Sequence, residues 1–135
     1  MSTAGYSGTP LPKKLGITDG ASVALVDDPG HAELLLTPLP AGATFVAKPA
    51  KADVVVFFTT ARQTFERRLP VLGRAIHPDR ALWIAWPKQS SGVETDMTEN
   101  VVREVALPLG LVDNKVCAID GVWSGLRLVW RRENR

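Results

Sequence analysis

With 135 residues, 45% of them hydrophobic and 22% charged, the chain is long enough for one folded domain with a substantial core. Its net charge of +2 gives no ground for a nucleic-acid or anionic-membrane partner, and one cysteine with two histidines predicts neither an internal disulfide nor a structural metal site. The sequence has no apolar amino-terminal run and no stretch of about 18 apolar residues, so we expect a cytoplasmic protein without a membrane span.

Six short apolar runs predict the strands of a sheet. Their ranges are 22–26, 44–47, 53–58, 81–86, 111–119 and 126–131. The run 53–58 is unbroken, which is typical of a strand buried on both faces of a parallel sheet. Trp83 and Trp86 lie three residues apart in one strand, so they should face opposite sides of the sheet. Residues 120–125 are rich in turn formers and predict an antiparallel hairpin between the last two strands.

Two short helices are predicted in the first third of the chain. Residues 1–8 are small and polar, and we expect them to be flexible. Thr9 as the cap and Pro10 in the first turn would then start a helix that Gly16 ends. The second short helix follows the first strand and stops near Pro38.

Two longer helices carry clear start signals. Thr60 with Gln63, and Asp96 with Glu99, each fit a capping box, in which two side chains satisfy free amide groups at the helix start. Pro70 lies inside the first of these helices. Because an interior proline costs about 3 kcal/mol, we expect a kink or a restart there.

The alternation of strands and helices predicts the topology. Helical crossovers make the first, third, fourth and fifth strands parallel, while the last strand is antiparallel, and the expected order is two, one, three, four, six, five. The fold class is therefore α/β. We expect residues 9–135 to form a single three-layer Rossmann-like domain, with a mostly parallel sheet of about six strands and a C-terminal antiparallel hairpin.

Three segments resemble S-adenosylmethionine-dependent methyltransferases. LGITDGASVALV is similar to the lead-in and first strand of that fold, RAIHPDRALWIAW to a later helix end, turn and strand, and LVDNKVCAID with LRLVWR to the terminal strand pair. The resemblance implies a methyltransferase-like fold, with one strand–helix unit missing between the second and third strands.

The cofactor motifs of that family are absent. The family needs a glycine-rich turn after the first strand, so that the backbone can approach the cofactor, but residues 27–31 read DDPGH and contain one glycine. The family also places an acidic residue after its second strand, where this chain has Lys48 and Pro49. We therefore expect no cofactor, and the sequence disfavours S-adenosylmethionine.

At closer range the chain resembles a family of small bacterial proteins of the actinobacterial type, a domain of unknown function. The segments that carry this resemblance are YSGTPLPKKLGI, WPKQSSGVETDMTENVVRE and VCAIDGVWSGLRLV, which together extend over nearly the whole chain. The resemblance implies no particular activity.

Ligands of open α/β sheets bind outside the carboxyl ends of the strands, so we expect a site at that edge. The loops predicted to meet there are 27–31, 48–51, 59–62, 87–96 and 120–125. Exposed amides and a helix dipole favour an anion at a helix start. The residues expected to bind a ligand are Lys88, Ser90, Ser91, Gly92, Thr59, Thr60 and Trp123. The alternative is a solvated loop in which Asp96 caps the following helix.

Acid–base chemistry is a further possibility at this edge. Asp27 and Asp28 could share a proton, and His31 could assist them, which makes these three the candidate catalytic residues. The alternative is ordinary turn chemistry, because aspartate before Pro-Gly favours a turn. Cys117 lies in an apolar strand, and we interpret it as an inert thiol.

Three hypotheses for function follow. The first is a non-catalytic methyltransferase-like domain that binds a small anionic ligand or a protein partner at the carboxyl edge. The second is an enzyme with a reduced site made of Asp27, Asp28 and Lys88. The third is a purely structural or interaction module that acts as a homodimer through the hairpin edge and Trp130. For the protein in general, we expect either a monomer or a homodimer.

Overall fold

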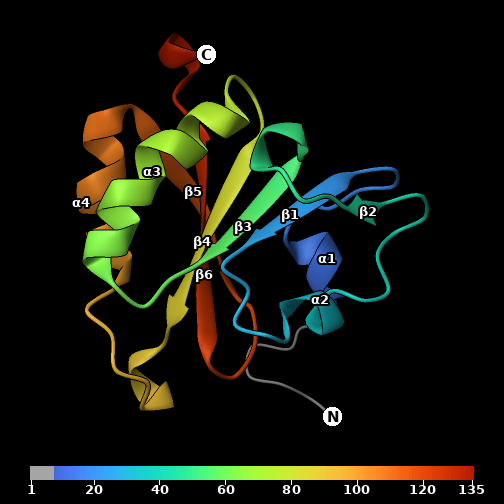
Figure 1. Ribbon diagram of the computed structural model, residues 1–135, viewed down its shortest axis with the longest axis horizontal. Coiled ribbons are helices and arrows are strands. Elements are labelled where there is room, and N and C mark those ends of the chain that lie inside the picture. Colours follow the sequence, from blue (N-terminus) through green and yellow to red (C-terminus); the bar gives the residue numbers. More distant parts are fainter. Residues whose placement is uncertain (1–7) are drawn as a thin grey trace.

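Six strands form one sheet in the computed structural model, which describes residues 8–135 (Figure 1). The strands are β1 (Ser22–Val26), β2 (Thr44–Phe45), β3 (Val54–Phe58), β4 (Ala81–Pro87), β5 (Leu111–Ala118) and β6 (Trp123–Trp130). Apart from Gly8, the predicted flexible amino terminus lies outside the described residues.

The strand order β2-β1-β3-β4-β6-β5 confirms the predicted topology. Parallel pairing joins β2, β1, β3 and β4, whereas β6 runs antiparallel to both of its neighbours, β4 and β5. Every residue of β3 and β4 is buried, as expected for strands covered on both faces.

Helices cover both faces of the sheet, so the fold has three layers (Figure 1). They are α1 (Leu11–Lys14), α2 (Ala32–Leu35), α3 (Arg62–Ile76) and α4 (Glu99–Ala106). The apolar sides of α3 and α4 form one core with the sheet, and α1 and α2 pack with the other face. Trp86 belongs to the α3 side and Trp83 to the α1 side, which confirms that they face opposite ways.

The crossovers on the β1–β2 side of the sheet are short. The helix between β1 and β2 has only four residues, and a single 3-10 turn, Pro49–Lys51, stands between β2 and β3. The connection from β2 to β3 therefore contains no further strand and no α-helix, as the sequence predicts. No helix within residues 8–135 is long and apolar enough to cross a bilayer.

The predictions for two helices need correction. The first helix begins at Leu11, and neither Thr9 nor another side chain caps it, although Gly16 follows its end in a left-handed conformation as expected. The helix α3 continues from Arg62 to Ile76, so Pro70 causes no restart, while the alternative of a kink at Pro70 stays a prediction. Its amphipathic packing against the sheet compensates for the backbone bond that proline cannot make.

Both predicted capping boxes are wrong, because the caps come from other residues. The side chain of Thr98 caps α4 by accepting a hydrogen bond from the amide of Val101 at 3.1 Å. Asp96 instead caps α3, since its Oδ1 accepts the amide of Arg62 at 2.7 Å. The loop after β4 thus provides the cap for the helix after β3.

Candidate functional site

Four of the five predicted loops meet at the carboxyl edge, the lower edge of the sheet in Figure 1. The loop after β1 reaches the β5–β6 turn through His31 and Asp120, whose side chains lie 3.0 Å apart. The loop after β4 reaches the same turn, because the amide of Lys88 donates to the carbonyl of Val122 at 2.8 Å. The same loop also joins the start of α3 through Asp96. These bonds make one connected edge.

The fifth loop, residues 48–51, does not belong to this edge. Arg80, which directly precedes β4, donates from its guanidinium to the carbonyls of Ala50 and Ala52 at 2.9 and 3.0 Å. The segment therefore lies at the amino end of β4, the upper edge in Figure 1. With only two residues in β2 and no helix after it, the chain turns back before it can reach the carboxyl edge.

The turn after β1 begins with a left-handed residue. Asp27 has a φ of 55°, a conformation that costs an L-residue free energy and that glycine adopts readily. Its carboxylate pairs with the guanidinium of Arg68 at 3.2 Å, and that guanidinium lies 5.5 Å from the ring centre of Phe57. Arg68 belongs to α3, so this pair links the end of β1 to the helix after β3.

The carboxylate of Asp28 is used inside the same turn. Its Oδ1 accepts the amides of Gly30 and Ala32 at 2.8 and 3.0 Å, and so caps α2. Partial burial opposes ionisation, but these backbone hydrogen bonds outweigh it, and the pKa of Asp28 lies below its ordinary value. The amides at the start of α2 thus face a carboxylate of their own chain.

His31 and Asp120 form a pair that brings together residues 89 positions apart. Asp120 is held firmly, because its Oδ1 accepts the amides of Val122 and Trp123 at 2.8 and 2.7 Å. Its side chain is 15% exposed, whereas that of His31 is 40% exposed. A histidine oriented by a carboxylate can act as a general base, and the same pair also ties two loops together.

The predicted anion-binding loop is largely occupied by its own hydrogen bonds. Residues Gln89–Ser91 form a 3-10 turn, and the hydroxyl of Ser91 donates to the carbonyl of Lys88 at 2.6 Å. The amides of Ser91 and Gly92 also donate within this turn. The side chains of Lys88, which is partly buried, and Ser90, which is exposed, can still reach an anion, so two of the four residues predicted in this loop remain candidates.

The other predicted ligand residues are mostly internal. Thr59 is buried, and its hydroxyl lies 3.3 Å from the amide of Ala61. The carbonyl of Thr60 accepts the hydroxyl of Thr95 at 2.6 Å, which fixes the loop after β4. Trp123 is also buried and packs edge-on against Phe58 with 5.2 Å between ring centres. It therefore presents no open aromatic face.

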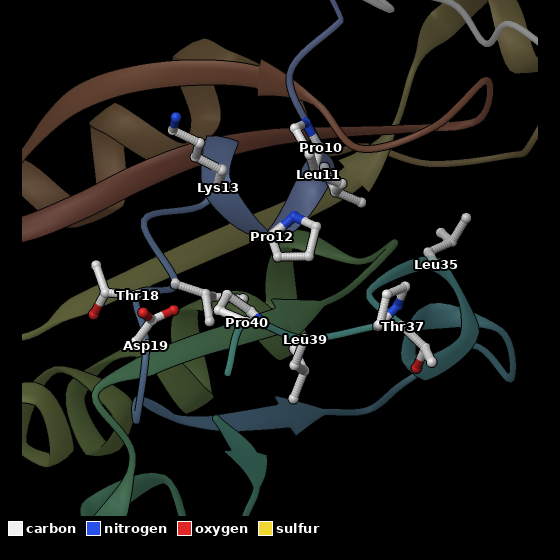
Figure 2. A pocket seen from close by; sticks show the side chains of 12 residues that line it. Pro10, Leu11, Pro12, Lys13, Thr18, Asp19, Leu35, Thr37, Leu39 and Pro40 are labelled. Carbon is white, nitrogen blue, oxygen red and sulfur yellow. The ribbon is translucent and has the colours of Figure 1, made fainter. Parts of the chain in front are cut away.

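The largest of five hollows described for residues 8–135 is a groove of about 880 Å³ between α1 and the segment after α2. Four prolines and several aliphatic side chains line it. In Figure 2, Pro12 lies in the middle, with Thr18 and Asp19 at one end and Leu35 at the other. The groove lies on the face where a full-length crossover helix would cover the sheet, since α2 has only four residues. None of the five hollows is lined by Asp27, Asp28 or Lys88.

Sequence reasoning missed two charged residues at this edge, Arg68 and Asp120. Nothing in the sequence distinguishes Arg68 from the other charged residues of its predicted helix, and Asp120 lies in the predicted turn of residues 120–125. Aspartate before glycine does signal a turn, and the amides that Asp120 accepts follow from that signal. Their partners, Asp27 and His31, lie 41 and 89 positions away in the sequence, so no local pattern reveals either pair.

No group of three or more potential metal ligands occurs within residues 8–135.

Replacing Asp96 with alanine is expected to lower the free energy of unfolding by about 1 kcal/mol, the usual cost of a lost helix cap. The amide of Arg62 would lose its acceptor, and the loop after β4 would lose a bond to α3. Urea unfolding measures the effect. Asp96→Asn keeps an acceptor and should cost less, and Glu94→Ala in the same loop is the matched exposed control. Equal stability of Asp96→Ala and Glu94→Ala would contradict the assigned cap.

Solved structures similar to this chain include several methyltransferases. A SAM-dependent methyltransferase from Aquifex aeolicus is 13% identical, with a TM-score of 0.59 over 86% of this chain and 85% of that one. A putative type 11 methyltransferase from Sulfolobus solfataricus is also 13% identical, with a TM-score of 0.58 over 90% and 89%. The magnesium protoporphyrin IX methyltransferase ChlM from Synechocystis PCC 6803, solved with bound SAM, is 10% identical, with a TM-score of 0.55 over 90% and 74%.

The protein thus has a Rossmann-like, methyltransferase-like α/β fold. No protein-family model and no curated protein matches the chain. At these identities the similarity establishes the fold alone, so the function has to be argued from the carboxyl edge itself.

Proposed function

We propose that this protein is a non-catalytic methyltransferase-like domain that binds a protein partner at the carboxyl edge of its sheet. The observation that carries the proposal is the turn after β1. In this fold the turn and the following helix start offer free backbone amides to a ligand. Here the carboxylate of Asp28 already accepts the amides of Gly30 and Ala32.

Two further features of the edge support the proposal. The ion pair between Asp27 and Arg68 crosses from the end of β1 to α3. Asp27, rather than glycine, holds the left-handed position directly after β1, where glycine would let the backbone approach a cofactor closely. The segment after β2 lies at the opposite edge, so no acidic side chain follows β2 where one would hold ribose hydroxyls. The residues present therefore do not fit S-adenosylmethionine in the manner of the fold family.

Exposed apolar side chains favour a protein as the partner. Leu34 in α2 is 78% exposed, and Val93 in the loop after β4 is 43% exposed. Both flank the connected loops of the carboxyl edge, and Leu34 directly precedes Leu35 at one end of the 880 Å³ groove. Apolar groups beside a groove are typical of protein contact surfaces. A small anionic ligand at Lys88 and Ser90 is the alternative occupant.

Isothermal titration with S-adenosylmethionine is expected to give no saturable heat at millimolar cofactor. The physical reason is that the turn amides and both aspartates are already paired inside the protein. Micromolar binding that disappears in Asp27→Ala would contradict the proposal.

For the protein partner, Leu34→Asp and Val93→Asp should each weaken association with a purified partner at least about tenfold, or about 1.4 kcal/mol. Val71→Asp, on the exposed side of α3, is the matched control.

A second candidate function is favoured by the pair of His31 and Asp120. The carboxylate orients an exposed imidazole at the edge where ligands of this fold class bind, which is the arrangement of a general base. This candidate replaces the predicted set of Asp27, Asp28 and Lys88, whose aspartates are engaged separately. It predicts a hydrolytic or transfer activity that His31→Gln abolishes in a protein that still unfolds cooperatively.

The predicted homodimer contact through Trp130 has less support. The indole N–H of Trp130 donates to the carbonyl of Gly73 at 2.8 Å, and its ring lies against α3. The ring also meets His77 edge-on, with 5.5 Å between centres. Trp130 therefore holds the last strand to α3, and the outer edge of β5 is the surface left for self-association.

A further inference from the structure

Two cations lie directly opposite each other on the last two strands. In the antiparallel pairing of β5 and β6, Lys115 is the cross-strand partner of Arg127. Like charges in that position repel each other and destabilise the sheet. A sheet that retains such a pair gains from it when an anion lies between the two side chains.

Neither cation is neutralised within the described part of the chain. The ammonium group of Lys115 donates to the carbonyl of Lys14 at 2.9 Å, and Nη1 of Arg127 donates to the amide oxygen of Asn114 at 3.2 Å. Both acceptors are uncharged, and the six ion pairs of residues 8–135 include neither cation. Burial lowers the pKa of Arg127, as expected for a cation that has lost water without gaining a carboxylate.

Two adjoining hollows open over this pair. One of about 500 Å³ is lined by Thr9, Lys13, Lys14 and residues 115–118 of β5. The other, of about 220 Å³, shares Lys14 and Lys115 with it and adds Arg127. Neither hollow is lined by an aspartate or glutamate among residues 8–135.

The nearest acidic groups line a different hollow. Arg127 also borders a hollow of about 400 Å³ with Asp19, Asp53 and Asp79. None of the three forms an ion pair with Arg127 in the described structure. The carboxylate of Asp53 accepts the amide of Ser22 at 2.9 Å instead. Lys115 and Arg127 are therefore two cations without a carboxylate partner among residues 8–135.

We propose that the basic groove, defined by Lys13, Lys14, Lys115 and Arg127, binds an organic phosphate with adjacent phosphate groups, such as a nucleoside diphosphate. The two hollows share Lys14 and Lys115 in their linings, so each can take one of two neighbouring phosphates, and lysine and arginine are the usual donors to such groups. The apolar part of β5 beside Val116, which is 57% exposed, gives the organic part of the ligand a surface to lie on. This site is separate from the carboxyl-edge site of the proposed function.

Thermal shift and isothermal titration with inorganic pyrophosphate and with ADP test the proposal. Both probes are expected to bind saturably and to raise the unfolding midpoint. Tighter binding of ADP would assign the organic part of the ligand to the surface beside Val116, whereas equal binding would restrict the site to the phosphates. Absence of saturable binding by either probe at millimolar concentration overturns the proposal.

Variants locate the site. Lys115→Gln is expected to weaken binding at least about tenfold, the loss typical of one charge-assisted hydrogen bond. Because it removes the repulsion with Arg127, the free variant should unfold at the same or a higher temperature than the parent, so weaker binding cannot be attributed to misfolding. Arg127→Gln should weaken binding to a similar extent.

Two control variants separate this proposal from its rivals. Lys51→Gln, in the turn after β2, should leave binding unchanged. Lys88→Gln should also leave it unchanged, and a loss there with normal binding by Lys115→Gln would move the anion to the carboxyl edge and overturn the groove. Equal weakening by all three lysine variants would indicate unspecific charge screening, which also overturns it.

Discussion

Replacing Trp83 with alanine is expected to lower the free energy of unfolding by about 3 to 5 kcal/mol, the range for large aromatic side chains in a core. Trp83 lies in β4 and is completely buried on the α1 side of the sheet. Its indole N–H donates to the carbonyl of Leu15 at 2.9 Å, just after α1 ends. The loss therefore combines a cavity with an unpaired buried carbonyl.

The substitution Trp83→Phe separates these two contributions. Phenylalanine keeps most of the apolar volume but leaves the carbonyl of Leu15 without its donor, so we expect a loss of about 1 to 3 kcal/mol. Urea unfolding followed by circular dichroism gives both values. Val71→Ala is the matched control, because Val71 is 56% exposed on α3 and should change stability by less than about 0.5 kcal/mol. A Trp83→Ala variant as stable as that control would contradict the assigned role.

The strand order could be predicted because it depends on features with a short reach along the chain. Each strand is an apolar run bounded by turn residues, and the handedness and length of the crossovers then restrict the sheet to few arrangements. The opposite orientations of Trp83 and Trp86 could be predicted in the same way, from the alternation of side chains along a strand. The predicted and observed orders agree because the hairpin of β5 and β6 is also local.

The caps and the site contacts depend on residues far apart in sequence, and there the predictions fail. A capping box assumes that a helix is capped by its own neighbours, yet Asp96 caps a helix that begins 34 residues earlier. The prediction that residues 48–51 lie at the carboxyl edge requires a second strand that extends to that edge. Because β2 has only two residues, the chain returns to the amino edge of the sheet, where the bond from Arg80 to the carbonyl of Ala50 holds this loop.

Replacing Asp120 with alanine is expected to lower the free energy of unfolding by about 2 kcal/mol. The carboxylate accepts the amides of Val122 and Trp123 and pairs with His31. A hydrogen bond to a charged group contributes about 1.5 to 3 kcal/mol net, and we expect a loss in this range because water replaces part of the lost contacts. Asp120→Asn keeps one carbonyl oxygen as acceptor and should lose less. The measurement is urea unfolding at neutral pH, with Asp19→Ala, an exposed aspartate before a turn, as the control.

Asp120 should also make the stability of the folded protein decrease as the pH falls. Burial opposes ionisation of Asp120, but hydrogen bonds from Trp123, His31 and Val122 outweigh it, so the pKa in the folded protein lies below the ordinary value of 3.8. A depressed carboxyl pKa stabilises the folded state fully above the unfolded value, and this contribution disappears as pH falls through the folded value. Unfolding midpoints measured from neutral pH down to that range should fall more steeply for the parent than for Asp120→Asn. Parallel curves for the two proteins would show that the carboxylate contributes no pH-dependent stability, and the hydrogen bonds that link the β5–β6 turn to His31 would then have to be reassigned.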